Sequence, residues 1–338
     1  MQVLFIGGTG IISSACSQLV VERGIELSLF NRGETKRPVP AGARVLHGDI
    51  RDIQAVRSAL AGQEFDVVVD WIAYTPDQVE RDIELFRDRT EQYIFISSAS
   101  AYQTPLASLP VTESTPLANP FWSYSRDKIA CEDRLVQAYR ESKFPMTIVR
   151  PSHTYDRTML PLYGGYTMID RMRKGKKVVV QGDGTSLWVL THHRDFAKGF
   201  LGLLGNVHAI GDSFHITSDE VLTWNQIYEI LARAAGVEPN LVHVASEWIN
   251  AFDPAWGADL IGDKAHSMIF DNTKIKRIVP DYSATIPFSQ GAHEIIEWYD
   301  ADAARRVVDA KLDRLLDQLV ATYESVLAQA PIYSTASN

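Results

Sequence analysis

The first half of the chain alternates short apolar runs with longer segments of helical periodicity. The periodic segments, in which apolar residues recur every three to four positions, predict helices at 11–23, 52–62, 77–89 and 123–142. The apolar runs predict strands at 2–7, 26–31, 43–49, 66–73, 92–98 and 146–151. Nearly continuous apolar strands separated by helices are typical of a parallel sheet covered on both faces. This part of the chain is therefore predicted to be α/β, with a Rossmann-like, doubly wound parallel sheet.

The pattern becomes less regular after residue 151. Further strands are predicted at 177–184 and 213–219, a helix at 224–235, and a long amphipathic helix at 299–328. We therefore expect a first domain over 1–175, to which part of 185–220 returns. A smaller C-terminal α/β part over 176–330 is expected to form most of the substrate-binding region and to contain the C-terminal helix. The polar end, 331–338, is expected to be disordered.

Composition and charge narrow the class of protein. The 338 residues are 46% hydrophobic and 22% charged, as in ordinary globular proteins, and the net charge is −9. An acidic chain is a poor partner for nucleic acid or for an anionic membrane surface. Cys16 and Cys131 form neither a disulfide framework nor a metal-binding spacing, and no signal peptide or membrane span is recognisable. We expect a cytoplasmic protein without a metal, a nucleic-acid partner or a membrane partner.

A glycine-rich turn, "FIGGTGIISSACSQL", lies between the first strand and the first helix. Glycines there allow positive φ and let the backbone approach a diphosphate at the helix N-terminus. Gly7, Gly10, Ile11 and Ile12 are therefore predicted to contact a dinucleotide. Ser13 stands where a third glycine is usual, and its hydroxyl could donate to a phosphate oxygen.

The second strand ends in "LFNRGETKR", with no carboxylate before Glu34. An acidic residue at this point would accept a hydrogen bond from the ribose of NAD, whereas an arginine pairs with the extra phosphate of NADP. Asn31 and Arg32 therefore favour NADP(H), while NAD(H) stays open because Arg32 could simply be a solvated loop residue. Asp49 and Ile50, at the end of the third strand, are expected at the adenine edge.

Ser98, Tyr124 and Lys128 form the candidate catalytic group. A tyrosine and a lysine four positions apart lie on one face of a helix. An ammonium group about 5 Å from a phenol would lower the phenol pKa by roughly 2 units, which would make Tyr124 a usable acid/base. The pair alone carries little information, because a tyrosine with a neighbouring cation is a common helical pattern.

The whole set of motifs resembles the extended branch of the short-chain dehydrogenase/reductases, the NAD-dependent epimerase/dehydratase family. The resemblance covers roughly residues 1–235 and rests on "GGTGII", "HGDIRD", "FISSASAYQ", "TESTPLANP…YSRDK", "IVRPSHTYD", "GDGTSLWV" and "HHRDFAKGF". It implies catalysis by Ser98, Tyr124 and Lys128, with Lys128 also binding the nicotinamide ribose and Ala73 near the cofactor. It also implies a homodimer formed through the Tyr/Lys helix and its neighbour.

Several positions depart from the family pattern. Ala99 and Ser100 replace the acidic pair of the sugar dehydratases, which argues against dehydration by that pair. Trp188 stands where an arginine usually binds a nucleotide diphosphate, and tryptophan cannot pair with phosphate. His153 replaces a substrate-contacting asparagine and could be a contact, an acid/base group or a packed side chain. His153, Trp122 and Trp188 are the candidate substrate contacts.

The sequence therefore predicts an NAD(P)-dependent oxidoreductase or epimerase. Its substrate would be a small molecule, sugar-like or otherwise polar, that reacts at a secondary alcohol or ketone with Tyr124 as acid/base. The alternative is a non-catalytic NAD(P)- or RNA-binding relative on the same fold. The segment 247–272 matches no recognisable chemistry, although it could close over the pocket.

Overall fold

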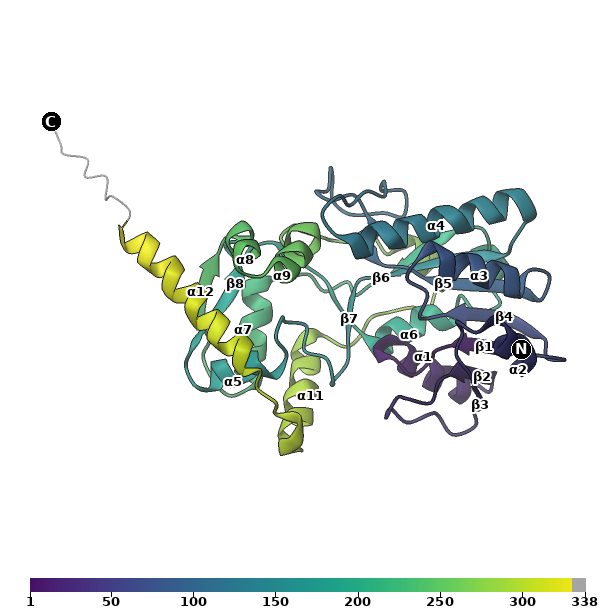
Figure 1. Cartoon of the computed structure of the whole chain (residues 1–338), viewed down its shortest axis with the longest axis horizontal. Helices are drawn as coiled ribbons and strands as arrows, with labels where there is room; N and C mark the ends of the chain where they lie inside the picture. Colours follow the sequence, from purple (N-terminus) through teal and green to yellow (C-terminus); the bar gives the residue numbers. More distant parts are fainter. Residues whose placement is uncertain (330–338) are drawn as a thin grey trace.

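The computed structural model describes residues 1–329, and its centre is a seven-stranded parallel sheet (Figure 1). The strand order is β11-β6-β5-β4-β1-β2-β3, which is the doubly wound arrangement expected from the sequence. The strands are β1 (Gln2–Ile6), β2 (Glu26–Asn31), β3 (Arg44–His47), β4 (Phe65–Asp70), β5 (Thr90–Ile96), β6 (Met146–Pro151) and β11 (Ser213–Ile216).

Helices cover both faces of this sheet because successive strand residues point to opposite sides. In β1, Val3 and Phe5 belong to one apolar cluster, and Leu4 and Ile6 belong to another. The first cluster packs under α1 (Ile11–Glu22) and α6 (His193–Leu201). The second packs under α2 (Ile53–Ala59), α3 (Pro76–Phe86) and α4 (Ser123–Ser142).

Several strands end earlier than predicted because the next residues form turns at the carboxyl edge of the sheet. β4 ends at Asp70, whose side chain accepts hydrogen bonds from the backbone N–H groups of Ile72 and Ala73. β5 ends at Ile96, and Ser98 then caps the short 3₁₀ helix η1 (Ala99–Ala101). These turns place polar groups where the parallel strands converge.

A second group of elements surrounds its own apolar cluster, to the left in Figure 1. Its strands form small pairs: β8 (Lys177–Gln181) with β13 (Asn240–Val244), β7 (His153–Tyr155) with β10 (Leu190–His192), and β9 (Leu187–Trp188) with β12 (Leu222–Thr223). Its helical segments are α5 (Tyr166–Arg173), α7 (Trp224–Ala234), α8 (Ser246–Phe252), α9 (Pro254–Asp259), η3 (Leu260–Lys264), α11 (Phe288–Asp300) and α12 (Ala310–Gln329). The remaining elements are η2 (Val207–Ala209), α10 (Thr273–Ile278) and η4 (Ala303–Arg305).

The prediction of a single long helix at 299–328 is wrong. The chain instead forms the end of α11, the short η4 and then α12. Asp302 accepts a hydrogen bond from the backbone N–H of Ala304, and Asp309 accepts from those of Lys311 and Leu312. An aspartate that caps a helix N-terminus favours the start of a new helix over the continuation of the previous one, so the helical segment is interrupted twice. The expected disordered tail, 331–338, lies outside the described residues.

Candidate active site

Two cavities lie at the carboxyl edge of the sheet. One, of about 390 Å³, is formed by the turns after β1, β2, β3 and β4 together with α3, and we call it the adenosine cavity after the part of the dinucleotide that the sequence predicts there. The other, of about 370 Å³, lies between the end of β5, the start of α4 and the second group of elements, and we call it the substrate cavity. This edge is where open α/β sheets bind their ligands.

The glycine-rich turn connects the two cavities. Gly7 and Gly8 have φ values of +97° and +92°, and a Cβ on Gly8 would lie 2.6 Å from a methyl carbon of Leu29. The turn therefore requires glycine at Gly8, which the sequence prediction did not select. Ser13 is buried, and its Oγ accepts a hydrogen bond of 2.8 Å from the N–H of Gly10. The hydroxyl oxygen thus closes the first helical turn, and its proton stays free to donate.

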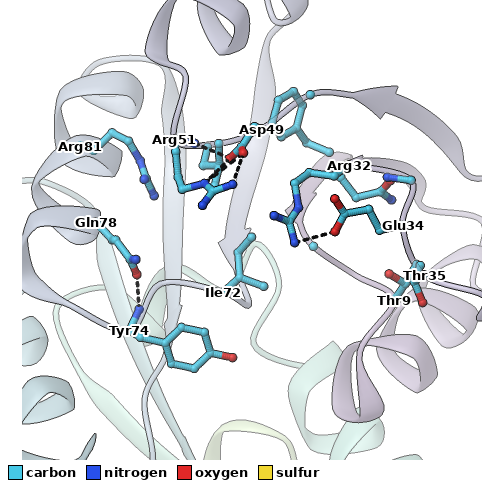
Figure 2. Close-up of a pocket in the computed structure, with 16 residues that line it drawn as sticks. Thr9, Arg32, Glu34, Thr35, Asp49, Arg51, Ile72, Tyr74, Gln78 and Arg81 are labelled. Atoms are coloured by element: carbon cyan, nitrogen blue, oxygen red, sulfur yellow. Dashed lines mark hydrogen bonds and ion pairs between the residues drawn. The ribbon is translucent and has the colours of Figure 1, made fainter.

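Guanidinium groups dominate the adenosine cavity, and Figure 2 shows them pointing toward it. Arg32 pairs with Glu34 at 2.8 Å, and Arg51 binds both carboxylate oxygens of Asp49. The Arg51 hydrogen bonds hold the pKa of Asp49 well below its usual range. Arg81, on α3, is largely buried, and its Nε has no hydrogen-bond partner among residues 1–329. An unpartnered buried donor beside a cavity is suited to a bound anion or acceptor.

Lys128 is buried beneath the boundary between the cavities. Its Nζ donates to the carbonyl oxygens of Ala73 and Ile96 at 2.7 and 2.8 Å. The ammonium lies 4.6 Å from the ring centroid of Tyr74 and 5.9 Å from that of Tyr124. Burial lowers the pKa of Lys128 to about 8. The lysine therefore holds together the turn after β4 and the end of β5.

Tyr124 lines the substrate cavity together with Ser98. Its ring centroid lies 4.9 Å from that of Trp122. Ser98 is held by Ser100, 2.9 Å between hydroxyl oxygens, and Ser100 in turn accepts a hydrogen bond of 2.9 Å from Ser125. Burial raises the pKa of Tyr124 to about 12, although a hydrogen bond with Ser98 acts in the opposite direction.

The expected lowering of the Tyr124 pKa by Lys128 is not what the structure shows. The lysine directs its ammonium at two carbonyl oxygens, and the phenol is desolvated in the cavity wall. Desolvation disfavours a phenolate, so its effect exceeds any favourable interaction. Tyr124 is consequently protonated across the neutral pH range.

His153 and Trp188 also reach the substrate cavity, where the indole Nε1 of Trp188 donates to His153 Nδ1 at 3.3 Å. Burial lowers the pKa of His153 to about 3. The imidazole is therefore neutral at physiological pH. Of the three roles considered for His153, an acid/base group near neutral pH is therefore disfavoured.

The segment 247–272 supplies one wall of the substrate cavity, in line with the expectation that it could close over the pocket, although its individual residues were not selected. Its π-helical turn η3 contributes Asp263 and Lys264, and the strand-like stretch after it contributes Met268 and Phe270. Single π-helical turns are frequently found at functional sites. No local pattern in the sequence distinguishes these residues, because their placement depends on long-range packing.

Most predicted site residues reach one of the two cavities. The adenosine cavity contains Gly7, Asn31, Arg32, Asp49 and Ile50, and the substrate cavity contains Ile11, Ile12, Ser98, Trp122, Tyr124, His153 and Trp188. Gly10, Ala73 and Lys128 line neither cavity, although Ala73 and Lys128 bind each other. Prediction did not select Thr9, Glu34, Arg51, Gln78 and Arg81 in the first cavity, nor Met159, Asp263, Lys264, Met268 and Phe270 in the second.

Comparison with known proteins places this geometry in a family. Residues 3–217 match the NAD dependent epimerase/dehydratase family. The chain is 25% identical over 331 residues to 2'-dehydrokanamycin reductase of Streptomyces kanamyceticus, covering 96% of this chain and 92% of that protein. It is 29% identical over 263 residues to the chloroplast stem-loop binding protein of 41 kDa b of Arabidopsis thaliana, a match of 72% of this chain and 65% of the relative's length.

Solved structures show the same fold. The dTDP-glucose 4,6-dehydratase of Bacillus anthracis, solved in complex with NAD, superposes with a TM-score of 0.72 at 18% identity, covering 90% of this chain and 98% of that one. The chain belongs to the NAD dependent epimerase/dehydratase family and is an enzyme of the NAD-dependent oxidoreductase or epimerase type. Within residues 1–329, no helix is long and apolar enough to cross a membrane, and no three His, Cys, Asp or Glu side chains gather to hold a metal ion.

Proposed function

We propose that this protein is an NADP(H)-dependent reductase that acts on a ketone of a sugar-like, polar small molecule. The observation that carries the proposal is the shared cavity of Tyr124 and Ser98, which also contains Ile11 and Ile12 from the dinucleotide turn. When bound, the nicotinamide supplies the hydride. The protein must then supply the proton, and Tyr124 is the acid in the right place.

The protonation state of Tyr124 is compatible with reduction. A phenol with a pKa of about 12 is a proton donor at neutral pH, and a ketone oxygen that receives hydride at carbon needs one proton to become an alcohol. Ser98, fixed by Ser100, can donate a second hydrogen bond that orients the same oxygen. Lys128 positions the turn after β4 through Ala73 and places a positive charge beneath the cofactor region.

The adenosine cavity supports NADP(H) over NAD(H). Its charged lining consists of three guanidinium groups, Arg32, Arg51 and Arg81, against the two carboxylates of Glu34 and Asp49, and Arg81 also contacts the buried Asp82 at 3.4 Å. An additional ribose phosphate would complement this excess of positive charge.

The substrate cavity supports a compact polar substrate without a diphosphate. Trp122, Trp188 and Tyr124 form aromatic walls, and Ala99 and Ser100 provide no acidic pair. Aromatic faces stack on the apolar faces of sugar rings, whereas phosphate needs cationic partners.

Cofactor content is the first test. A reductase exchanges its cofactor in each cycle, whereas an epimerase keeps it. We expect the purified protein to release well under one equivalent of dinucleotide on acid denaturation, and to bind added NADPH more tightly than NADH. Release of one equivalent of NAD would contradict the reductase proposal and favour an epimerase.

A second function is raised by the similarity to the stem-loop binding protein. Its test is filter binding of a stem-loop RNA over a range of salt concentrations. The net charge of −9 leads us to expect no salt-dependent RNA binding. Salt-sensitive binding that survives in Tyr124→Phe would support RNA recognition independent of the enzyme chemistry.

A further inference from the structure

The substrate cavity contains one carboxyl group that the proposed reaction does not use. Asp263 lies on η3 and faces the cavity that holds Tyr124, and its side chain is 13% exposed. Among residues 1–329, no donor forms a hydrogen bond with its carboxylate oxygens. A carboxylate that is largely desolvated and has no hydrogen-bond donor is costly, so a cationic ligand in the cavity would stabilise it.

The position of Asp263 is fixed by the packing of its π-helical turn. The carbonyl of Gly262 accepts a hydrogen bond of 2.6 Å from Asn119 Nδ2, and the carbonyl of Lys264 accepts one of 3.1 Å from Trp224 Nε1. A Cβ on Gly262 would lie 2.9 Å from that of Trp122. The turn is therefore held closely against the aromatic wall, which gives the carboxyl a defined direction.

The neighbouring lysine does not neutralise Asp263. Lys264 forms its short ion pair with Asp259, whereas its Nζ is 4.0 Å from Asp263. Asp263 and Lys264 are the carboxylate and ammonium groups of the cavity lining, and His153 is neutral. With Lys264 paired to Asp259, one carboxyl remains available. Burial raises the pKa of Asp263 to about 7, although the ammonium of Lys264 acts in the opposite direction.

We propose that Asp263 is a specificity-determining residue that binds a protonated amine of the substrate, so that the enzyme acts on amine-bearing, sugar-like ketones. This rests on the proposed function and names the substrate class for the same cavity. An ammonium group would give the carboxylate charge-assisted hydrogen bonds, and the ring of Trp188 in the cavity lining would add a cation–π contact; the ring of Trp122 already lies 5.8 Å from Lys264 Nζ. A diphosphate would instead place negative charge against Asp263.

The inference can be tested by binding, without knowledge of the natural substrate. Calorimetric titrations of the full-length protein with saturating NADP⁺ compare methyl α-D-glucopyranoside with its 2-amino, 3-amino and 6-amino derivatives. At least one amino derivative should bind about tenfold more tightly than the hydroxyl parent, as one charge-assisted contact allows. Asp263→Asn should reduce this preference to within about threefold, as the charge is removed.

Glu247→Gln is the matched control, because Glu247 is an exposed acid of the same segment and lines neither cavity. It should retain the wild-type preference. The inference is overturned if all amino derivatives bind wild-type protein no better than the parent, if the preference survives in Asp263→Asn, or if uridine 5′-diphosphate binds more tightly than every amino derivative. The first and third results need no variant, so poor folding of Asp263→Asn cannot conceal a failure.

NADPH titrations of the same samples separate this inference from the proposed function. Normal NADPH affinity without any amine preference contradicts the role of Asp263 alone. Absence of NADPH binding contradicts the proposed function itself.

Discussion

The two cavities have almost the same volume, about 390 and 370 Å³, but different chemistry. The adenosine cavity is ionic, with arginines on both sides of its opening (Figure 2). The substrate cavity is aromatic and has a single carboxyl, Asp263, whose neighbour Lys264 pairs more closely with Asp259. The first is built by turns that follow consecutive strands. The second combines short segments that are far apart in the chain, from Ile11 to Phe270.

This difference separates two tasks of the enzyme. Turns at strand ends present backbone N–H groups and a few arginines in a fixed arrangement, which suits a ligand of constant shape. A cavity between two groups of elements can change one wall without disturbing the sheet, which suits variation in the substrate. Substitutions in one cavity should therefore leave binding in the other nearly unchanged.

Of the variants considered, Tyr124→Phe should have the largest effect on turnover. That effect should be confined to the substrate cavity. Loss of the proton donor should lower NADPH-dependent reduction of keto-sugars by about 10³-fold, within the usual range for general acid catalysis. NADPH affinity should stay within about twofold, because the lost hydroxyl belongs to the substrate cavity. Tyr139→Phe, on the exposed side of the same helix, is the control and should be fully active. Undiminished turnover in Tyr124→Phe would contradict the mechanism.

The buried Lys128, which lies between the cavities, should make the free energy of unfolding depend strongly on pH over a defined range. Its pKa is about 8 in the folded protein against 10.5 in the unfolded chain. The unfolded chain therefore binds the proton more tightly between these values. Stability should rise as the pH rises from about 8 to about 10.5, by up to about 3 kcal/mol from this group.

Urea unfolding of wild type and Lys128→Met at pH 8, 9 and 10 measures this contribution. Other alkaline titrations occur in both proteins and cancel in the difference. The variant should lack the rise that the lysine gives to wild type. Parallel pH dependences in the two proteins would show that the buried ammonium has an ordinary pKa.

Sequence reasoning succeeded where the signal was local. The apolar runs identified every strand of the central sheet, and the predicted turn around Gly7 lies at the edge of the sheet where the adenosine cavity is found. It also selected Ser98 and Tyr124, which line one cavity in the structure. Both could be selected because the end of a strand and the start of a helix are each recognised from local sequence. It could not predict the direction of the Lys128 ammonium, which depends on two carbonyl oxygens from other segments.

Asp263 shows why the second cavity was harder to predict. Its neighbours in sequence form no recognisable motif, and its position depends on contacts with Asn119, Trp122 and Trp224. The prediction of one continuous helix over 299–328 failed for a related reason. Asp302 and Asp309 can lie within an amphipathic helix or cap the start of a new one, and the surrounding packing decides which occurs.

Arg32→Ser should have a moderate effect on the cofactor preference of the adenosine cavity. If Arg32 binds the additional phosphate of NADPH, the ratio of NADPH to NADH affinity should fall about tenfold, the value of one charge-assisted interaction at an exposed site. Arg51→Ser should have a similar effect, since both arginines line this cavity. Arg44→Ser, outside the cavity and bonded to Gln63, is the control. An unchanged ratio in both cavity variants would favour NAD(H).

His153→Gln should have the smallest effect, because His153 already behaves as a neutral acceptor. With a pKa of about 3 it does not titrate between pH 5 and 8, and a glutamine oxygen can accept the same hydrogen bond from Trp188. Turnover should stay within about threefold of wild type, and the pH profile over this range should keep its shape. Loss of an inflection between pH 6 and 7 in His153→Gln would identify the imidazole as an acid/base group. An inflection near pH 7 that persists there but disappears in Asp263→Asn would instead belong to the carboxyl of the substrate cavity, whose pKa is about 7.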